Sequence, residues 1–160
     1  MLDDTYKSYI FKFIDIHPAT NGSQFQFNFS IDSGSNYNVT KTSTNFAAYN
    51  EETGDGNGLA YRTAYDLAQS TSFQTIMEDF DTSSYSGSGS GVGILKLFNP
   101  SSTTFVKHFI SKCHHLRDST YAWSAYVAGY ANTTSAVDAI QFKFSAGNID
   151  DGIIKLYGVK

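Results

Sequence analysis

The sequence predicts an all-β fold, an antiparallel β-sandwich of jelly-roll type. Short segments rich in Phe, Tyr, Val and Ile recur along the chain, and clusters of Gly, Asn, Asp and Ser separate them at a spacing of roughly 8–12 residues. Charged residues make up 16% of the chain and aromatic residues another 16%. A length of 160 residues fits one domain, residues 1–160, with a core that needs neither metal nor disulfide.

Two strands are predicted near the N-terminus. Tyr6–Ile16 is apolar at both parities, which indicates a strand that is covered on both faces. Gln24–Ile31 alternates strictly between apolar and polar residues and places its three phenylalanines on one face. The intervening His17–Gly22 contains Pro and Asn-Gly, so we expect a turn and a hairpin.

The middle of the chain is more polar. Tyr37–Tyr49 and Leu59–Tyr65 read as extended segments. One short helix is predicted over residues 72–80, with Ser72 as its cap, because Phe73, Ile76, Met77 and Phe80 share one helical face. Asp81–Gly93 is rich in Ser and Gly and predicts a flexible loop, with Ser83–Gly91 mobile and without a catalytic serine.

Five strands follow in quick succession. They are Val92–Phe98, Thr104–Leu116, Tyr121–Ala131, Val137–Phe144 and Ile153–Tyr157. The last two are expected to form a closing hairpin, with Phe142, Phe144 and Leu156 in the core.

Charge and cysteine content exclude several classes of function. The formal charge of −4 argues against nucleic-acid binding, which favours a basic patch. The single cysteine, Cys113, allows no internal disulfide and reads as a small buried apolar residue. Residues 1–5 lack the features of a signal peptide, and no apolar run is long enough to span a membrane. We therefore expect synthesis in a cytoplasm.

No catalytic, cofactor or metal site is assigned. His108 and His114 are separated by about 20 Å of strand, and His115 points to the opposite face. The Glu51–Gly58 loop lacks the ligand spacing of a calcium site and reads as a turn. Ser86–Gly91 matches a nucleophile motif only as text. The sequence gives no reason to pair any of four carboxylates for catalysis, namely Asp15, Glu78, Asp118 and Asp138.

One segment is unusually aromatic. Tyr121 and Trp123 share one face of the predicted strand, and Tyr126 and Tyr130 share the other. Such rings stack on sugars when exposed, but packing in a core or between subunits is the more common use.

The C-terminal third resembles a family of known proteins. Residues 137–158 follow the form I-D-x-I-x-F-x-x-x-x-G-N-I-x-x-G-x-I-x-L-Y-G, with Val137 in the first position. This pattern resembles small virion structural proteins of tailed phages that infect marine bacteria and cyanobacteria. The Ile16–Thr20 run is also similar to that group, and the likeness extends over Leu97–Val159.

The resemblance implies a non-enzymatic virion protein. We expect a capsid decoration (cement) protein on the virion surface, which binds between major capsid subunits and forms a homotrimer. The alternative is a tail-fibre or receptor-binding module that recognises glycans on the host cell. No cofactor, nucleic acid or membrane is expected as a partner.

Overall fold

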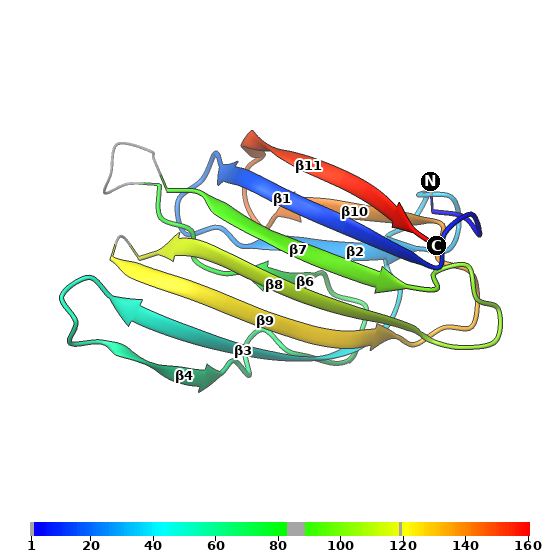
Figure 1. Cartoon of the computed structure of the whole chain (residues 1–160), viewed down its shortest axis with the longest axis horizontal. Helices are drawn as coiled ribbons and strands as arrows, with labels where there is room; N and C mark the ends of the chain where they lie inside the picture. The colour runs from blue at the N-terminus through cyan, green and yellow to red at the C-terminus, as the bar shows by residue number, and fades with distance from the viewer. Residues whose placement is uncertain (1, 83–88, 119) are drawn as a thin grey trace.

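The computed structural model describes residues 2–82, 89–118 and 120–160, and it confirms the all-β antiparallel sandwich (Figure 1). These residues contain strands, turns and bends but no helix. The two facing sheets that a jelly roll requires are present, although the strands divide between them unequally, eight to three.

The large sheet runs in the order β11–β1–β7–β8–β9–β3–β4, and β5 also pairs with β3. Every pairing is antiparallel. Its strands are β1 (Ser8–Pro18), β3 (Lys41–Glu51), β4 (Asn57–Tyr61), β5 (Leu67–Ser70), β7 (Gly91–Phe98), β8 (Lys107–Arg117), β9 (Tyr121–Ala131) and β11 (Ile149–Val159).

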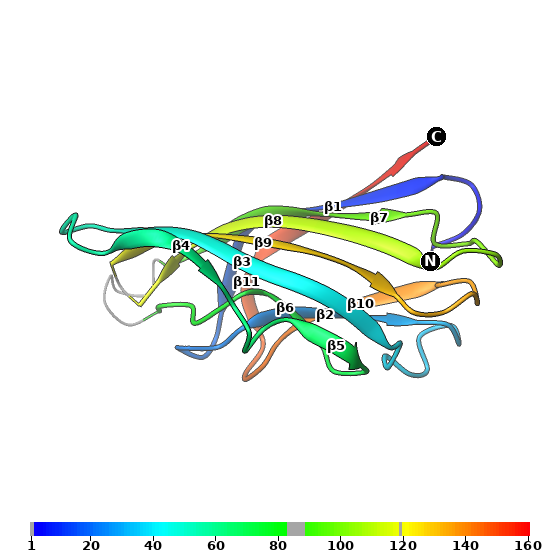
Figure 2. The ribbon, with the colours of Figure 1, turned by 90° about the horizontal axis from the view of Figure 1, so that it is seen from below.

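The small sheet has the order β10–β2–β6 and covers one face of the large sheet (Figure 2). Its strands are β2 (Phe25–Ser30), β6 (Gln74–Met77) and β10 (Ala139–Phe144). We call the face of the large sheet that packs against it the inner face, and the opposite one the outer face.

Phenylalanine rings join the two sheets. Phe13 of β1 meets Phe25 of β2 with ring centroids 5.2 Å apart, and Phe109 of β8 meets Phe27 of β2 at the same distance. Both contacts are edge-to-face, a geometry worth about 0.5–1.5 kcal/mol beyond the area that it buries. The predicted alternation in β2 is confirmed, because its three phenylalanines are all buried.

Both predicted hairpins are wrong. β1 pairs with β7 and β11, whereas β2 pairs with β6 and β10, so the turn at residues 19–24 crosses between sheets. The chain crosses again between β10 and β11. Period-two patterns identify the face of a strand that is buried, but they do not identify its neighbour.

The predicted helix over residues 72–80 is a strand, β6, with flanking bends. All four of its residues are buried: Ile76 and Met77 belong to the core, and Thr75 bonds the side chains of Gln24 and Gln26. Gln74 satisfies its buried amide by donating to the carbonyl oxygens of Tyr65 and Thr75. The apolar spacing of Phe73–Phe80 therefore reflects burial on two faces, not helical periodicity.

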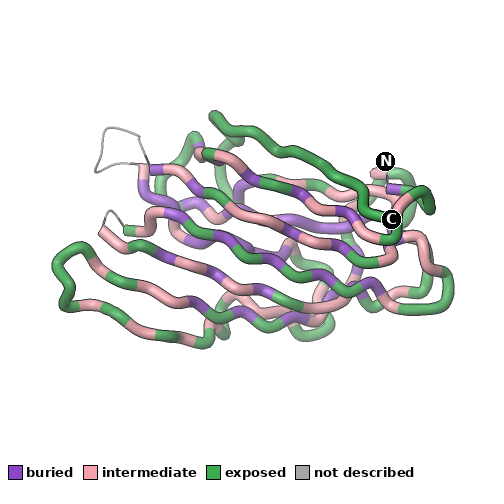
Figure 3. The backbone as a smooth tube through the Cα atoms, viewed as in Figure 1, coloured by how far each residue is buried: buried purple, intermediate pink, exposed green. Residues whose placement is uncertain are grey.

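Of the predicted core residues in the last two strands, Phe144 is buried and Phe142 is partly buried against the rings of Phe11 and Phe13. Leu156 is not in the core, because the small sheet does not extend under β11, and 48% of its surface is exposed. The whole of β11 is exposed (Figure 3). The predicted flexible loop ends earlier than expected, since Gly91 already belongs to β7. Residues 83–88 of that loop lie outside the described residues.

Candidate interaction surface

The outer face of the large sheet carries exposed apolar side chains instead of the polar ones usual on a solvated sheet. Ile110 of β8 and Phe46 of β3 are 52% and 44% exposed. Strand register sets these residues in rows across the sheet. The central row runs Lys155–Lys12–Ile94–Lys112–Tyr126–Phe46–Tyr61.

Aromatic rings stack along this central row. Phe46 and Tyr126 lie parallel, with centroids 5.0 Å apart and an interplanar angle of 7°. The Lys112 ammonium lies 5.4 Å from the Tyr126 ring centroid. In the same way Lys12 lies 5.0 Å from the ring of Tyr157 on β11. Each lysine thus keeps its charge in solvent while its stem lies on apolar surface.

The outer face is also positively charged. The central row and its two neighbours contain four lysines and no Asp or Glu, namely Lys12, Lys96, Lys112 and Lys155. Because the whole chain has a formal charge of −4, the rest of the molecule carries −8. The surface is therefore divided into a lysine-bearing face and an acidic remainder.

Two shallow hollows lie on this face. The larger, of about 450 Å³, is lined mainly by Phe46, Ile94, Ile110 and Tyr126, with Lys96 and Lys112 at its side. The second, of about 430 Å³, is lined by Val92 and Ile94 of β7, with Lys12 and Lys112 on either side of them. Apolar hollows beside cations are suited to a partner that presents apolar groups next to carboxylates.

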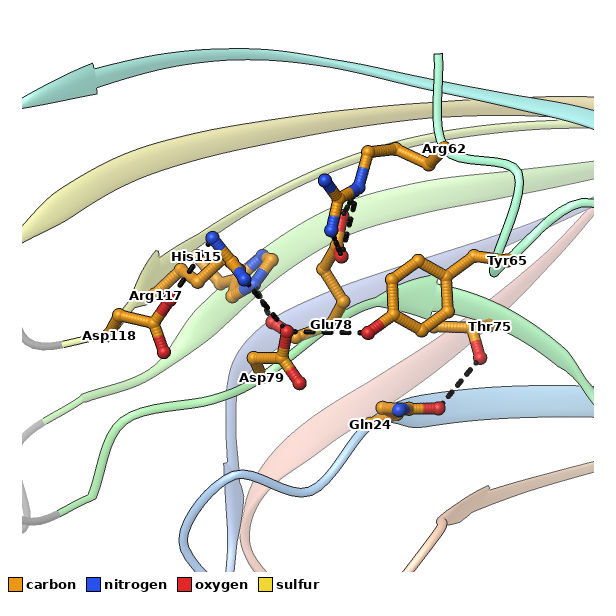
Figure 4. A network of polar contacts seen from close by, with 9 residues as sticks. All are labelled: Gln24, Arg62, Tyr65, Thr75, Glu78, Asp79, His115, Arg117 and Asp118. Atoms are coloured by element: carbon orange, nitrogen blue, oxygen red, sulfur yellow. Dashed lines mark hydrogen bonds and ion pairs between the residues drawn. The ribbon is translucent and has the colours of Figure 1, made fainter. Parts of the chain in front are cut away.

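A cluster of polar side chains lies on the inner face, where β8 meets the segment after β6 (Figure 4). Arg62 binds Glu78 through two nitrogens, with its Nη2 2.6 Å from Oε2 and its Nε 3.1 Å from Oε1. Arg117 donates to Asp79 at 2.9 Å, and the Tyr65 hydroxyl donates to the same carboxylate. The side chain of Glu78 is buried, and burial raises its pKa.

This cluster stabilises the end of the sandwich that the small sheet does not cover. The guanidinium groups of Arg117 and Arg62 lie 4.4 Å and 5.1 Å from the ring centroid of Trp123, which also stacks on Tyr49. Its carboxylates are thus held by arginines that are themselves packed on aromatic rings. The arrangement is that of a packed structural network.

His114 lies on one face of β8, and Cys113 and His115 lie on the other, as the sequence predicted. His114 faces outward and shares a hydrogen bond with Ser124. His115 is buried, stacks on Phe80 and shares a hydrogen bond through Nε2 with the carbonyl oxygen of Glu78. Cys113 is buried, and burial raises the pKa of its thiol to about 12.

The structure also places the other candidate residues. Glu78 belongs to the network just described, and Asp118 joins it by pairing with Arg117 at 3.0 Å. Asp138 instead accepts a hydrogen bond from the backbone of Ser33, and Asp15 lies in β1. Glu51 and the exposed residues after it form the turn between β3 and β4. Across the described residues, no three His, Cys, Asp or Glu side chains gather as metal ligands would.

The aromatic segment is divided by its strand as predicted. Trp123 is buried on the inner face, whereas Tyr126 faces outward, where it stacks on Phe46. Sequence reasoning missed Phe46, Ile110 and Lys112 as members of one surface. Their outward parity was readable, but the neighbours of β8 were needed to bring them together.

Comparisons with protein-family models, with curated proteins and with solved structures found no match. Among the residues that the structure describes, none form a helix with the length and apolar character needed to cross a bilayer.

Proposed function

We propose that the protein is a non-enzymatic virion structural protein, a capsid decoration protein that binds between major capsid subunits through its outer face. The observation that carries this proposal is the combination of exposed apolar side chains and four lysines, with no carboxylate, across three rows of the large sheet. The resemblance of residues 137–158 to phage virion proteins supplies the setting. Burial of such a face across a joint between capsid subunits would resist their separation.

The partner surface would be acidic with apolar groups at its centre. Lysines without neighbouring acids attract an acidic surface and repel a second lysine-bearing face. This makes face-to-face stacking of two copies unfavourable and favours a different protein as the partner. The major capsid protein is the partner that we propose.

Binding to capsids that lack the protein tests the proposal. Lys112→Glu on the outer face should weaken binding by about tenfold or more, because it removes an attraction and adds a repulsion. Lys143→Glu is the matched control, because Lys143 is an exposed lysine on β10 of the small sheet. Equal binding by both variants would contradict the proposed use of the outer face.

A receptor-binding module for host glycans is the second candidate. The row of rings at Phe46, Tyr126 and Tyr61, of which Tyr126 is half-buried, favours it, because sugars bind aromatic side chains at wet surfaces. Copy number in the virion separates the two functions. Hundreds of copies in each virion support decoration, whereas a dozen or fewer support a tail position.

A further inference from the structure

The last strand of the large sheet, β11, is long and has a free edge. Within the described part of the chain it pairs only with β1, and all eleven of its residues are exposed (Figures 1 and 3). Six of them are large and apolar, with exposed fractions of 37–52%: Ile149, Ile153, Ile154, Leu156, Tyr157 and Val159. A long, apolar edge strand is a template for pairing with another strand, and proteins seldom leave one open.

An apolar groove adjoins this edge on the inner side. Ile154 and Leu156 of β11 line it together with Ile140 and Phe142 of β10, and its volume is about 290 Å³. β11 and β10 are the end strands of their sheets, and the C-terminal part of β11 rises away from β10 (Figure 2). Both sheets are therefore open on this side of the sandwich.

The distribution of charge along β11 selects its partner. Asp150 and Asp151 lie at the start of the strand, and Lys160 follows its end. A second β11 in antiparallel orientation brings the acidic start of each strand toward the Lys160 of the other. A parallel alignment would instead place like charges beside each other, which is unfavourable.

We propose that two copies of this chain pair antiparallel through β11 about a two-fold axis at Leu156. In this register Leu156 faces its own copy, Ile153 faces Val159, and Lys155 faces Tyr157. Lysine already lies over this tyrosine within one chain, since Lys12 contacts Tyr157. The pairing satisfies the free backbone edge of residues 153–159 and joins the two large sheets into one.

The opposite edge of the sheet provides the contrast. β4 has only five residues, of which Leu59 is 78% exposed, and none of them is charged. It offers fewer backbone groups and no charge pattern to align a second copy. The proposed interface therefore belongs to β11 and uses its free backbone edge, whereas the contact that we assign to the capsid uses the outer face of the sheet.

Sedimentation velocity on the purified chain tests the pairing. We expect a species of twice the 17.6 kDa chain mass at high concentration. Leu156→Lys should raise the dissociation constant by about tenfold or more, because it sets two lysines opposite each other at the axis. Leu59→Lys on β4 is the matched control and should leave self-association unchanged. A thermal melt of each variant checks that folding is intact.

Crosslinking tests the register. Opposed residues in antiparallel strands have Cα atoms about 4.5–5.5 Å apart, within the range that a disulfide spans. Leu156→Cys should therefore form a disulfide-linked dimer on mild oxidation, and Leu59→Cys should not. The native Cys113 is buried and contributes no background.

Three results would overturn the proposal. They are a monomer at every concentration, a threefold mass such as the homotrimer that the sequence led us to expect, and a dimer that is insensitive to Leu156→Lys. A monomer whose Leu156→Lys variant loses capsid binding would assign this edge to the capsid protein instead.

Discussion

The two faces of the large sheet both contain lysine, but they hold it in opposite environments. On the outer face, Lys112 lies over the ring of Tyr126 with its charge toward solvent. On the inner face, Lys41 and Lys107 are fully buried, and no carboxylate accepts from either ammonium group in the described structure. Lys41 instead bonds Asn28 and the carbonyl oxygen of Val39, and Lys107 bonds that of Thr133.

Burial changes the chemistry of the inner lysines. It lowers the pKa of Lys41 to about 7 and also lowers the pKa of Lys107, because the charged form loses its hydration. The comparison shows that apolar content alone does not distinguish the two faces. The inner face suppresses charge and packs against phenylalanines, whereas the outer face keeps charge of one sign, which suits a surface that binds a partner.

The largest expected effect sharpens this contrast with two neighbouring residues of β8. Phe109 is fully buried against Phe27 and Phe29, whereas Ile110 points outward and is 52% exposed. Phe109→Ala should cost ~3–5 kcal/mol of unfolding free energy, because it leaves a cavity between the sheets. Ile110→Ala should cost less than about 1 kcal/mol. Urea denaturation measures both, and equal losses would mean that the outer face is part of the folding core.

The next effect concerns the buried ion pair. Arg62→Met leaves the Glu78 carboxylate without its partner. Only 2% of the Glu78 side chain is exposed. Breaking a fully buried pair costs about 3–5 kcal/mol, and we expect about 2–3 kcal/mol here because Arg62 is partly solvated. The double variant Arg62→Met with Glu78→Met should recover much of the loss. A double variant no more stable than Arg62→Met would show that the network matters through its other contacts.

The sequence revealed the faces of strands better than their neighbours. Strict alternation with polar residues predicted a buried face for Phe25, Phe27 and Phe29, and the structure buries all three. Nothing in that pattern showed that β2 would pair with β10, more than one hundred residues away, instead of with β1. Strand partners depend on long-range contacts and on the turns between sheets, which local periodicity does not encode.

The sequence did not reveal the candidate interaction surface for the same reason. The outer face joins residues of β3, β7, β8 and β9, and each strand contributes only two or three residues to the larger hollow. Exposed Ile110 reads as an ordinary strand residue until register places Lys96 beside it. The burial of Lys41 was equally unreadable, because a lysine at the start of a polar strand predicts a solvated side chain.

Lowering the pH should reveal the contribution of His115 to the stability of the fold. Its pKa is lowered to about 3 in the folded protein, mainly because burial disfavours the charged ring. No described group bonds its Nδ1, so a second proton there would be buried without an acceptor. A depressed folded pKa gives stability that is present above pH 6.5 and is lost as pH falls from 6.5 toward 3. His115→Gln should remove part of this loss between pH 6.5 and 4, whereas His114→Gln on the outer face should not.

The last expected effect concerns Lys41. Its pKa is about 7 in the folded protein, whereas the ordinary pKa of lysine is 10.5, so the unfolded chain binds the extra proton between these two values. Stability should therefore rise as pH increases above 7, by at most about 1.4 kcal/mol per pH unit, and that gain is lost again as pH falls back to 7.

Lys41→Met isolates this contribution. The variant is less stable overall, because Asn28 and Val39 lose the group that donates to them, so the slope with pH is the informative quantity. Chemical denaturation between pH 7 and 9 should show a rise for the wild-type protein and for Lys112→Met, and a flatter profile for Lys41→Met. Parallel profiles for all three proteins would mean that Lys41 keeps its proton when buried, and that the two faces treat lysine alike.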